Sequence, residues 1–105
     1  MGELDRKVAI VTGAGRLRGI GRAAAVAFAR LGSDVVVTGT GRNPETFPLD
    51  EKKIGWRDVE SVADLIRAEG RRAMPLIVDV TNRFQVDDMI KKTLEEFGRV
   101  DILVN

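Results

Sequence analysis

A glycine-rich segment near the N-terminus has the composition of a phosphate-binding loop. It runs from Thr12 to Gly21, reads TGAGRLRGIG and holds four glycines within nine residues. Glycines let the backbone approach phosphate oxygens, and the free amides and dipole of a following helix attract the anion. The segment therefore predicts a diphosphate site. The alternative is a glycine-rich turn that serves packing alone.

Other phosphate and metal chemistries do not fit the sequence. The G-x-G-x-x-G spacing fails because Arg18 stands where the third glycine should be, and no Gly-Lys-Ser/Thr occurs. Cysteine and histidine are absent, so disulfides, thiolate ligands and imidazole ligands are excluded. The acidic residues show no spacing typical of a metal site, and we expect none.

Apolar runs alternate with segments of helical period, which is typical of a parallel sheet covered by helices. The predicted strands are 8–11, 35–38, 74–78 and 102–104. The first helix is predicted from an apolar stripe that ends at Gly32, and the stripe consists of Ile20, Ala24, Ala27, Phe28 and Leu31.

Two further helices are predicted, each with a starting signal. Asp58 is the expected N-cap of the second, whose apolar stripe is Val59, Val62, Ala63 and Ile66. Asn82 and Gln85 fit a capping box for the third, which Gly98 closes. Residues 40–57 break both periods and predict an irregular insertion.

The resulting order predicts one partial domain over residues 1–105. It is an α/β fold with a Rossmann-type parallel sheet of strand order 3-2-1-4. The first two helices should cover one face and the third the other. The fourth strand would be an exposed apolar edge, so we expect the natural polypeptide to continue beyond this truncated sheet.

The glycine segment resembles the T-G-x-x-x-G-x-G fingerprint of the short-chain dehydrogenase/reductase family. Five residues separate Gly13 from Gly19, where the family has three, so Leu17-Arg18 looks like a two-residue insertion. Asp79-Val80 is similar to the family's adenine contact, although Asp79 could be a turn residue or helix cap. The stretch 98–105 resembles the approach to the family's N-N-A-G motif, with Asn105 as its first asparagine.

The resemblance implies the first half of an oxidoreductase that uses a nicotinamide dinucleotide to transfer hydride to or from an alcohol or ketone. The candidate cofactor residues, taken from this resemblance and from the charges near the end of the second strand, are Thr12, Gly13, Gly15, Arg16, Arg18, Gly19, Ile20, Gly21, Gly39, Arg42, Asp79, Val80 and Asn105. The family's catalytic serine, tyrosine, lysine and relay asparagine lie beyond N-N-A-G. Tyrosine is absent here, so we expect no catalytic residue in this chain and no activity from it alone.

The end of the second strand favours NADP over NAD. An NAD site usually has a carboxylate there for the ribose hydroxyls, but this chain has Gly39 and no acid from Val35 to Asn43. Arg16, Arg18 and Arg42 could instead hold a 2′-phosphate. The alternative is that these arginines simply face water.

The insertion at 40–57 is longer than its connection requires, and loops of this length are often functional. It could fold over the adenosine end of the cofactor, with Lys52 and Lys53 adding positive charge. The alternative, which we favour, is a surface decoration with Trp56 packed against the second helix.

The composition excludes some classes of binding partner. A net charge of +1 argues against a nucleic-acid binder, and no apolar run is long enough to span a membrane. We expect a cytoplasmic protein whose intact form is a homo-oligomer. The main alternative is a non-catalytic half-domain that binds an adenine dinucleotide with a partner chain. A methyltransferase that uses S-adenosylmethionine and a flavodoxin-like receiver fit less well.

Overall fold

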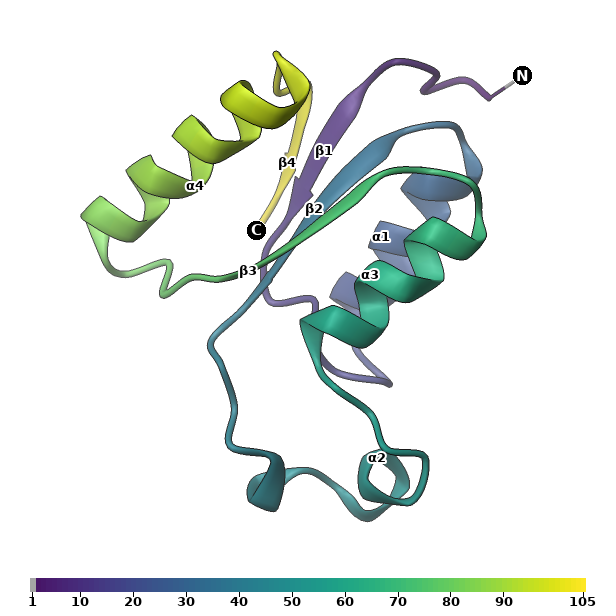
Figure 1. The fold of residues 1–105 in the computed structure, drawn as a ribbon, viewed down its shortest axis with the longest axis vertical. Helices are drawn as coiled ribbons and strands as arrows, with labels where there is room; N and C mark the ends of the chain where they lie inside the picture. The colour runs from purple at the N-terminus through teal and green to yellow at the C-terminus, as the bar shows by residue number, and fades with distance from the viewer. Residues whose placement is uncertain (1) are drawn as a thin grey trace.

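The computed structural model describes residues 2–105, and its centre is a four-stranded parallel sheet. The strands lie side by side in the order β3-β2-β1-β4, as the sequence predicts (Figure 1). A continuous apolar run forms β1 and a β-branched run, Val35 to Thr38, forms most of β2, as expected of strands that are buried on both faces. The strands are β1 (Val8–Val11), β2 (Asp34–Gly39), β3 (Ala73–Ile77) and β4 (Ile102–Val104).

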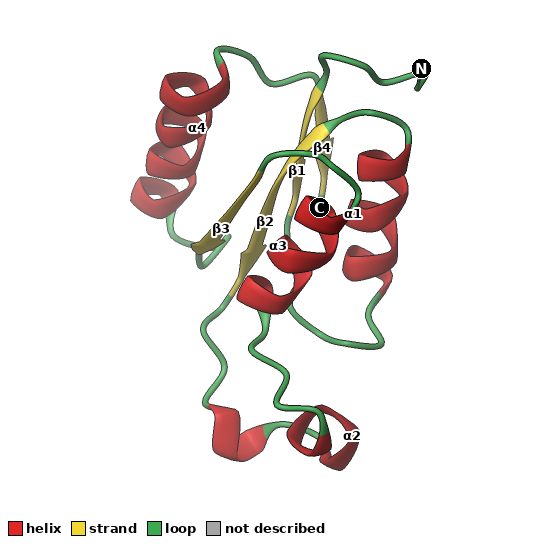
Figure 2. Ribbon diagram, turned by 45° about the vertical axis from the view of Figure 1, so that its right-hand side comes forward, coloured by secondary structure: helices red, strands yellow, loops and turns green. Residues whose placement is uncertain are grey.

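Three helices cover the two faces of the sheet, and their distribution confirms the prediction. Helices α1 (Ile20–Arg30) and α3 (Val59–Ala68) lie together on one face, and α4 (Arg83–Phe97) lies on the other (Figures 1 and 2). The side chains of β2 alternate between the faces: Val37 joins the core beneath α1 and α3, and Val36 joins the core beneath α4. The fold is thus of the Rossmann type.

The buried face of α1 matches the predicted stripe only in part, since Ala24 and Phe28 pack against the core as predicted. Ala25, Val26 and Ala29 are its buried residues, whereas Ile20 is 89% exposed and Leu31 lies at the surface. An alanine-rich helix offers several nearly equivalent apolar faces, so contact with the sheet and α3 decides which one is buried. Gly32 follows the helix with φ 103°, which confirms it as the residue that lets the chain turn away.

The starts of α3 and α4 follow the prediction only in part. Asp58 precedes α3 as expected, and the stripe of α3 is buried, but no side-chain bond caps the helix through Asp58. At α4, the Oδ1 of Asn82 accepts from the amide of Gln85 at 3.2 Å. The Oε1 of Gln85 accepts from the amide of Asp79 at 2.7 Å, so the reciprocal half of the capping box is replaced by a bond to the preceding loop.

The insertion after β2 is more regular than predicted. It contains a single 3-10 turn (Pro44–Thr46) and a short helix, α2 (Leu49–Lys53). The insertion extends beyond the carboxyl edge of the sheet and returns to the start of α3 (Figure 1). Phe47 and Glu51 are buried within it, so these residues form a small packed unit.

None of the helices between residues 2 and 105 is long and apolar enough to cross a membrane. Within that range, no three acidic, histidine or cysteine side chains gather as they would around a metal ion.

Candidate functional site

The glycine loop lies at the carboxyl edge of the sheet. The amide of Thr12 donates to the carbonyl of Val104 at the end of β4, at 2.9 Å, and the amide of Ala14 donates to the carbonyl of Thr38 at the end of β2, at 2.8 Å. The loop therefore crosses the ends of three strands before α1 begins. This is the edge where parallel α/β sheets bind ligands.

Two of the loop's glycines are required by backbone geometry. Gly13 has φ 63°, a conformation that residues with side chains rarely adopt. A Cβ on Gly21 would lie 2.7 Å from the carbonyl oxygen of Gly13, so the first turn of α1 packs against the loop at a distance that only glycine allows. The loop and the helix start are thus held together as one unit.

The N-terminus of α1 is open to an anion. Its N-cap residue is Gly19, no side chain caps it, and no acidic residue lies in its first turn. The first amides of a helix have no partner within the helix, and they carry partial positive charge. Together with the strand-edge position, this is the physical basis on which the loop fits a diphosphate.

The two-residue insertion in the glycine loop is attached to the insertion at 40–57. The amide of Leu17 donates to Oε2 of the buried Glu51 at 2.9 Å, and Arg18 forms an ion pair with Asp50. Trp56 donates its indole N–H to the carbonyl oxygen of Gly15 at 2.7 Å. The enlarged glycine loop and the insertion at 40–57 therefore contact each other. Trp56 also packs against the core that includes α3, as the favoured alternative for this insertion expects.

Arg42 is fixed inside the insertion. Its Nη2 lies 3.0 Å from Oε1 of Glu51 and 2.6 Å from Oδ1 of Asp58, and its guanidinium carbon lies 4.4 Å from the centre of the Phe47 ring. Burial alone would lower the pKa of Arg42, but the hydrogen bonds and charges of Asp58 and Glu51 outweigh it and raise that pKa. The alternative that Arg42 simply faces water is therefore wrong, while its contact with a phosphate stays a prediction.

Asp58 brings a carboxylate to the end of β2, where the sequence shows no acid nearby. An ideal Cβ on Gly39 would lie 3.0 Å from Oδ2 of Asp58, and one on Gly15 would lie 2.4 Å from Oδ1. The premise that this position lacks an acid is therefore wrong. Sequence reasoning identified Asp58 only as an N-cap, because a contact across 19 positions leaves no local pattern.

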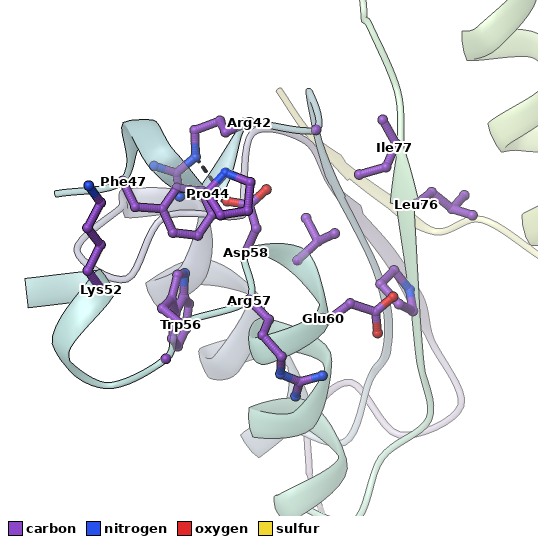
Figure 3. Close-up of a pocket in the computed structure, with 14 residues that line it drawn as sticks. Arg42, Pro44, Phe47, Lys52, Trp56, Arg57, Asp58, Glu60, Leu76 and Ile77 are labelled. Carbon is purple, nitrogen blue, oxygen red and sulfur yellow. Dashed lines mark hydrogen bonds and ion pairs between the residues drawn. The ribbon is translucent and has the colours of Figure 1, made fainter.

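Two cavities adjoin this carboxylate. The smaller, of about 230 Å³, is lined by Gly13, Gly15, Arg16, Gly39, Thr40, Arg42 and Asp58. The larger, of about 550 Å³, lies between the insertion and β3 and is mainly apolar, with Arg42 facing Asp58 at its border (Figure 3). The smaller cavity is the better candidate for a nucleotide, since the glycine loop forms its wall.

The other predicted cofactor residues lie at two places along the carboxyl edge of the sheet, one at Asn105 and one at Asp79 and Val80. Asn105 accepts from the Thr12 hydroxyl at 2.9 Å through its Oδ1. Asp79 and Val80 lie exposed after β3. The Thr81 hydroxyl and amide donate to Oδ1 of Asp79 at 2.6 and 2.9 Å, and these bonds lower the pKa of Asp79. Asp79 is therefore a turn residue, as the alternative interpretation of this position predicts. Its side chain is also exposed and accessible to a ligand.

The positive side chains divide into paired and unpaired ones. Arg18 is exposed but paired with Asp50, and Arg16 is exposed with no ion pair to any residue of the described range 2–105. Ile20 lies uncovered at the start of α1, next to the glycine loop. Its exposure suits a contact with a ligand better than the core role first predicted for it.

Comparisons with known proteins agree with this geometry. The family model described as short chain dehydrogenase matches residues 7–105. A 12alpha-hydroxysteroid dehydrogenase from Clostridium sp. is 40% identical over 109 aligned residues, which cover 100% of this chain and 37% of that protein.

Solved structures give the same result. A putative short-chain dehydrogenase/reductase from Burkholderia xenovorans has a TM-score of 0.78 at 35% identity, covering 100% of this chain and 37% of that one. A short chain dehydrogenase from Mycobacterium paratuberculosis, solved bound to NAD, has a TM-score of 0.78 at 29% identity, covering 97% and 36%. The chain thus spans little more than a third of these relatives. It belongs to the short-chain dehydrogenase family.

Proposed function

We propose that residues 1–105 are the cofactor-binding part of an NAD(P)(H)-dependent oxidoreductase that acts on a small-molecule alcohol or ketone. Family membership supports this proposal, and its main structural support is the glycine loop beside the uncapped start of α1. A bound nicotinamide would supply the hydride donor or acceptor. This chain's own residues would hold and orient the dinucleotide.

The proposed roles follow the geometry of the edge. The backbone of the glycine loop and the first turn of α1 would hold the diphosphate, Asp79 and Val80 would contact the adenine, and Thr12 with Asn105 would mark the nicotinamide end. Arg42 would act indirectly, by holding Asp58 in place. The full proposed set is Thr12, Gly13, Gly15, Arg16, Arg18, Gly19, Ile20, Gly21, Gly39, Arg42, Asp79, Val80 and Asn105.

The preference for NADP that the sequence predicts loses most of its support in the structure. That preference depended on free arginines and on the absence of a carboxylate near the end of β2. Arg42 pairs with two carboxylates, Arg18 pairs with Asp50, and Asp58 lies beside Gly39, which leaves Arg16 alone in support of a 2′-phosphate. The proposed cofactor is therefore a nicotinamide dinucleotide, either NAD or NADP.

Catalysis is proposed to need residues outside this chain. The chain has no tyrosine, which is the general acid/base that its family resemblance implies. We expect the 105-residue chain to be inactive and the intact enzyme to be a homo-oligomer. The cytoplasmic location stays a prediction from composition.

The test is a calorimetric titration of the intact protein with NAD, NADH, NADP and NADPH, followed by assays with secondary alcohols and ketones. Binding of at least one dinucleotide, together with turnover, is the expected result. Dinucleotide binding with no turnover, in a protein whose native mass equals this chain, would favour the non-catalytic half-domain instead. No dinucleotide binding at all would contradict both.

A further inference from the structure

The carboxylate of Asp58 occupies the space that a side chain at position 39 would fill. Its Oδ2 lies 3.0 Å from the ideal Cβ position of Gly39, and its Oδ1 lies 2.4 Å from that of Gly15. A side chain at either position would collide with it unless something moved. The two glycines therefore make room for a carboxylate that comes from the start of α3.

Only one oxygen of this carboxylate is occupied. Oδ1 accepts from Nε and Nη2 of Arg42, at 3.0 and 2.6 Å. No donor from residues 2–105 reaches Oδ2, and the side chain does not cap α3. Asp58 is 8% exposed and borders the cavity of about 230 Å³ beside the glycine loop. Oδ2 is not an enclosed orphan like the hydroxyl of Thr38, and it is therefore open to a donor that a ligand in this cavity brings.

The charge around this oxygen selects the kind of ligand. Arg42 contributes one positive charge, and Glu51 and Asp58 contribute two negative charges, so this hydrogen-bonded cluster carries a net charge of −1, while Arg16, unpaired among the described residues, lines another part of the same cavity. A neutral hydroxyl donates to such a cluster favourably. A phosphate would be repelled by it. Arg42 could turn toward a phosphate only by giving up two ion pairs and the Phe47 ring.

We propose that Asp58 determines the cofactor preference of this protein by accepting hydrogen bonds from the adenosine ribose hydroxyls, and that the cofactor is NAD. The carboxylate would come from the end of the insertion, 19 positions after the strand residue that it replaces. Arg42 and Glu51 are positioning residues, because they hold Asp58 over Gly39. This inference depends on the proposed function, since it names which dinucleotide the same site takes.

The first test is Asp58→Gly in the intact protein, with dissociation constants for NAD and NADP measured by calorimetry. Asp58 has φ 59°, so glycine accepts its backbone without strain, and Glu51 still pairs with Arg42. We expect the dissociation constant for NAD to rise about tenfold and that for NADP to fall or stay the same. Asp58→Asn should shift the ratio in the same direction and serves if the glycine variant fails to fold.

A rescue variant separates ligand contact from a purely structural role. Gly39→Asp combined with Asp58→Gly returns a carboxylate to the same place from the strand itself. We expect it to restore at least half of the lost preference for NAD. Asp64→Asn is the matched control, because it removes an exposed carboxylate from the same helix, and it should leave both constants within about twofold.

The outcomes separate this inference from the proposed function. If the unmodified protein binds neither dinucleotide, the proposed function fails. If it binds NADP more tightly than NAD, the inference is wrong and the proposed function stands. The same conclusion follows if Asp58→Gly weakens both cofactors equally and Gly39→Asp restores nothing.

Discussion

The indole nitrogen of Trp56 lies 2.7 Å from the carbonyl oxygen of Gly15, which attaches the insertion after β2 to the glycine loop. Glu51 makes a second attachment through the amide of Leu17. The insertion at 40–57 therefore supports the enlarged loop from outside the sheet. The lid over the adenosine, which was the less favoured of the two hypotheses, stays untested, whereas the contact with the loop is part of the structure.

Trp56→Phe should weaken this support. The variant keeps an aromatic ring but leaves the Gly15 carbonyl without its donor, so we expect a loss of about 1 kcal/mol in the free energy of unfolding. Dinucleotide affinity should fall by a few fold, because the loop is less well held. Urea unfolding followed by circular dichroism and calorimetric binding measure the two effects. Unchanged values for both would show that the hydrogen bond contributes nothing.

Gly21→Ala should impair binding more than folding. The added Cβ would lie 2.7 Å from the carbonyl oxygen of Gly13, so the helix start and the loop must separate. We expect dinucleotide affinity to fall by about tenfold or more.

Gly98→Ala is the matched control for that loop variant. Gly98 has φ 79° after α4, and an added Cβ would meet nothing within 4 Å. We expect a stability loss of about 1 kcal/mol with unchanged binding. If the two variants reduced affinity equally, the close approach of α1 to the loop would not be what the ligand requires.

Ile66→Ala should lower stability by about 2–5 kcal/mol, because the side chain is fully buried between α3 and the sheet. The neighbouring Leu65 is 36% exposed on the same helix, so Leu65→Ala should cost about 1 kcal/mol or less. Urea denaturation of both variants gives the comparison. Similar losses would contradict the assignment of the buried face of α3.

Acid should weaken the attachment of β1 to the segment before β4. The bond from Arg99 and the bond from the amide of Val8, at 2.8 Å, lower the pKa of Asp101. A carboxylate whose pKa is lower when folded stabilises the protein above its unfolded pKa of about 3.9, and this stability is lost as pH falls through the lower folded value.

Asp101→Asn should therefore reduce the steepness of the stability loss between about pH 4 and pH 2. Thermal unfolding across this range measures it. Asp87→Asn, which removes an exposed carboxylate from α4, is the control and should keep the steepness of the unmodified protein. An equal effect of both variants would assign the change to overall charge.

The sequence by itself determined the strand order, the faces that the helices cover, the family and the place of the glycine loop. These follow from local signals, since β-branched runs, helical period and glycine punctuation each act within a few residues. The stripe of α3 was predictable for the same reason. The stripe of α1 was predictable only in part, because its alanines make several faces almost equally apolar.

Only the tertiary structure decided what surrounds the end of β2. The pairing of Arg42 with Glu51 and Asp58, and the bond from Trp56 to Gly15, join residues that are 9 to 41 positions apart. No periodicity or spacing records such contacts, because they arise when the insertion folds back on the loop. The pairing of Arg42 with two carboxylates beside the glycine loop therefore depends on packing, whereas the sequence alone indicated an arginine without acidic partners there.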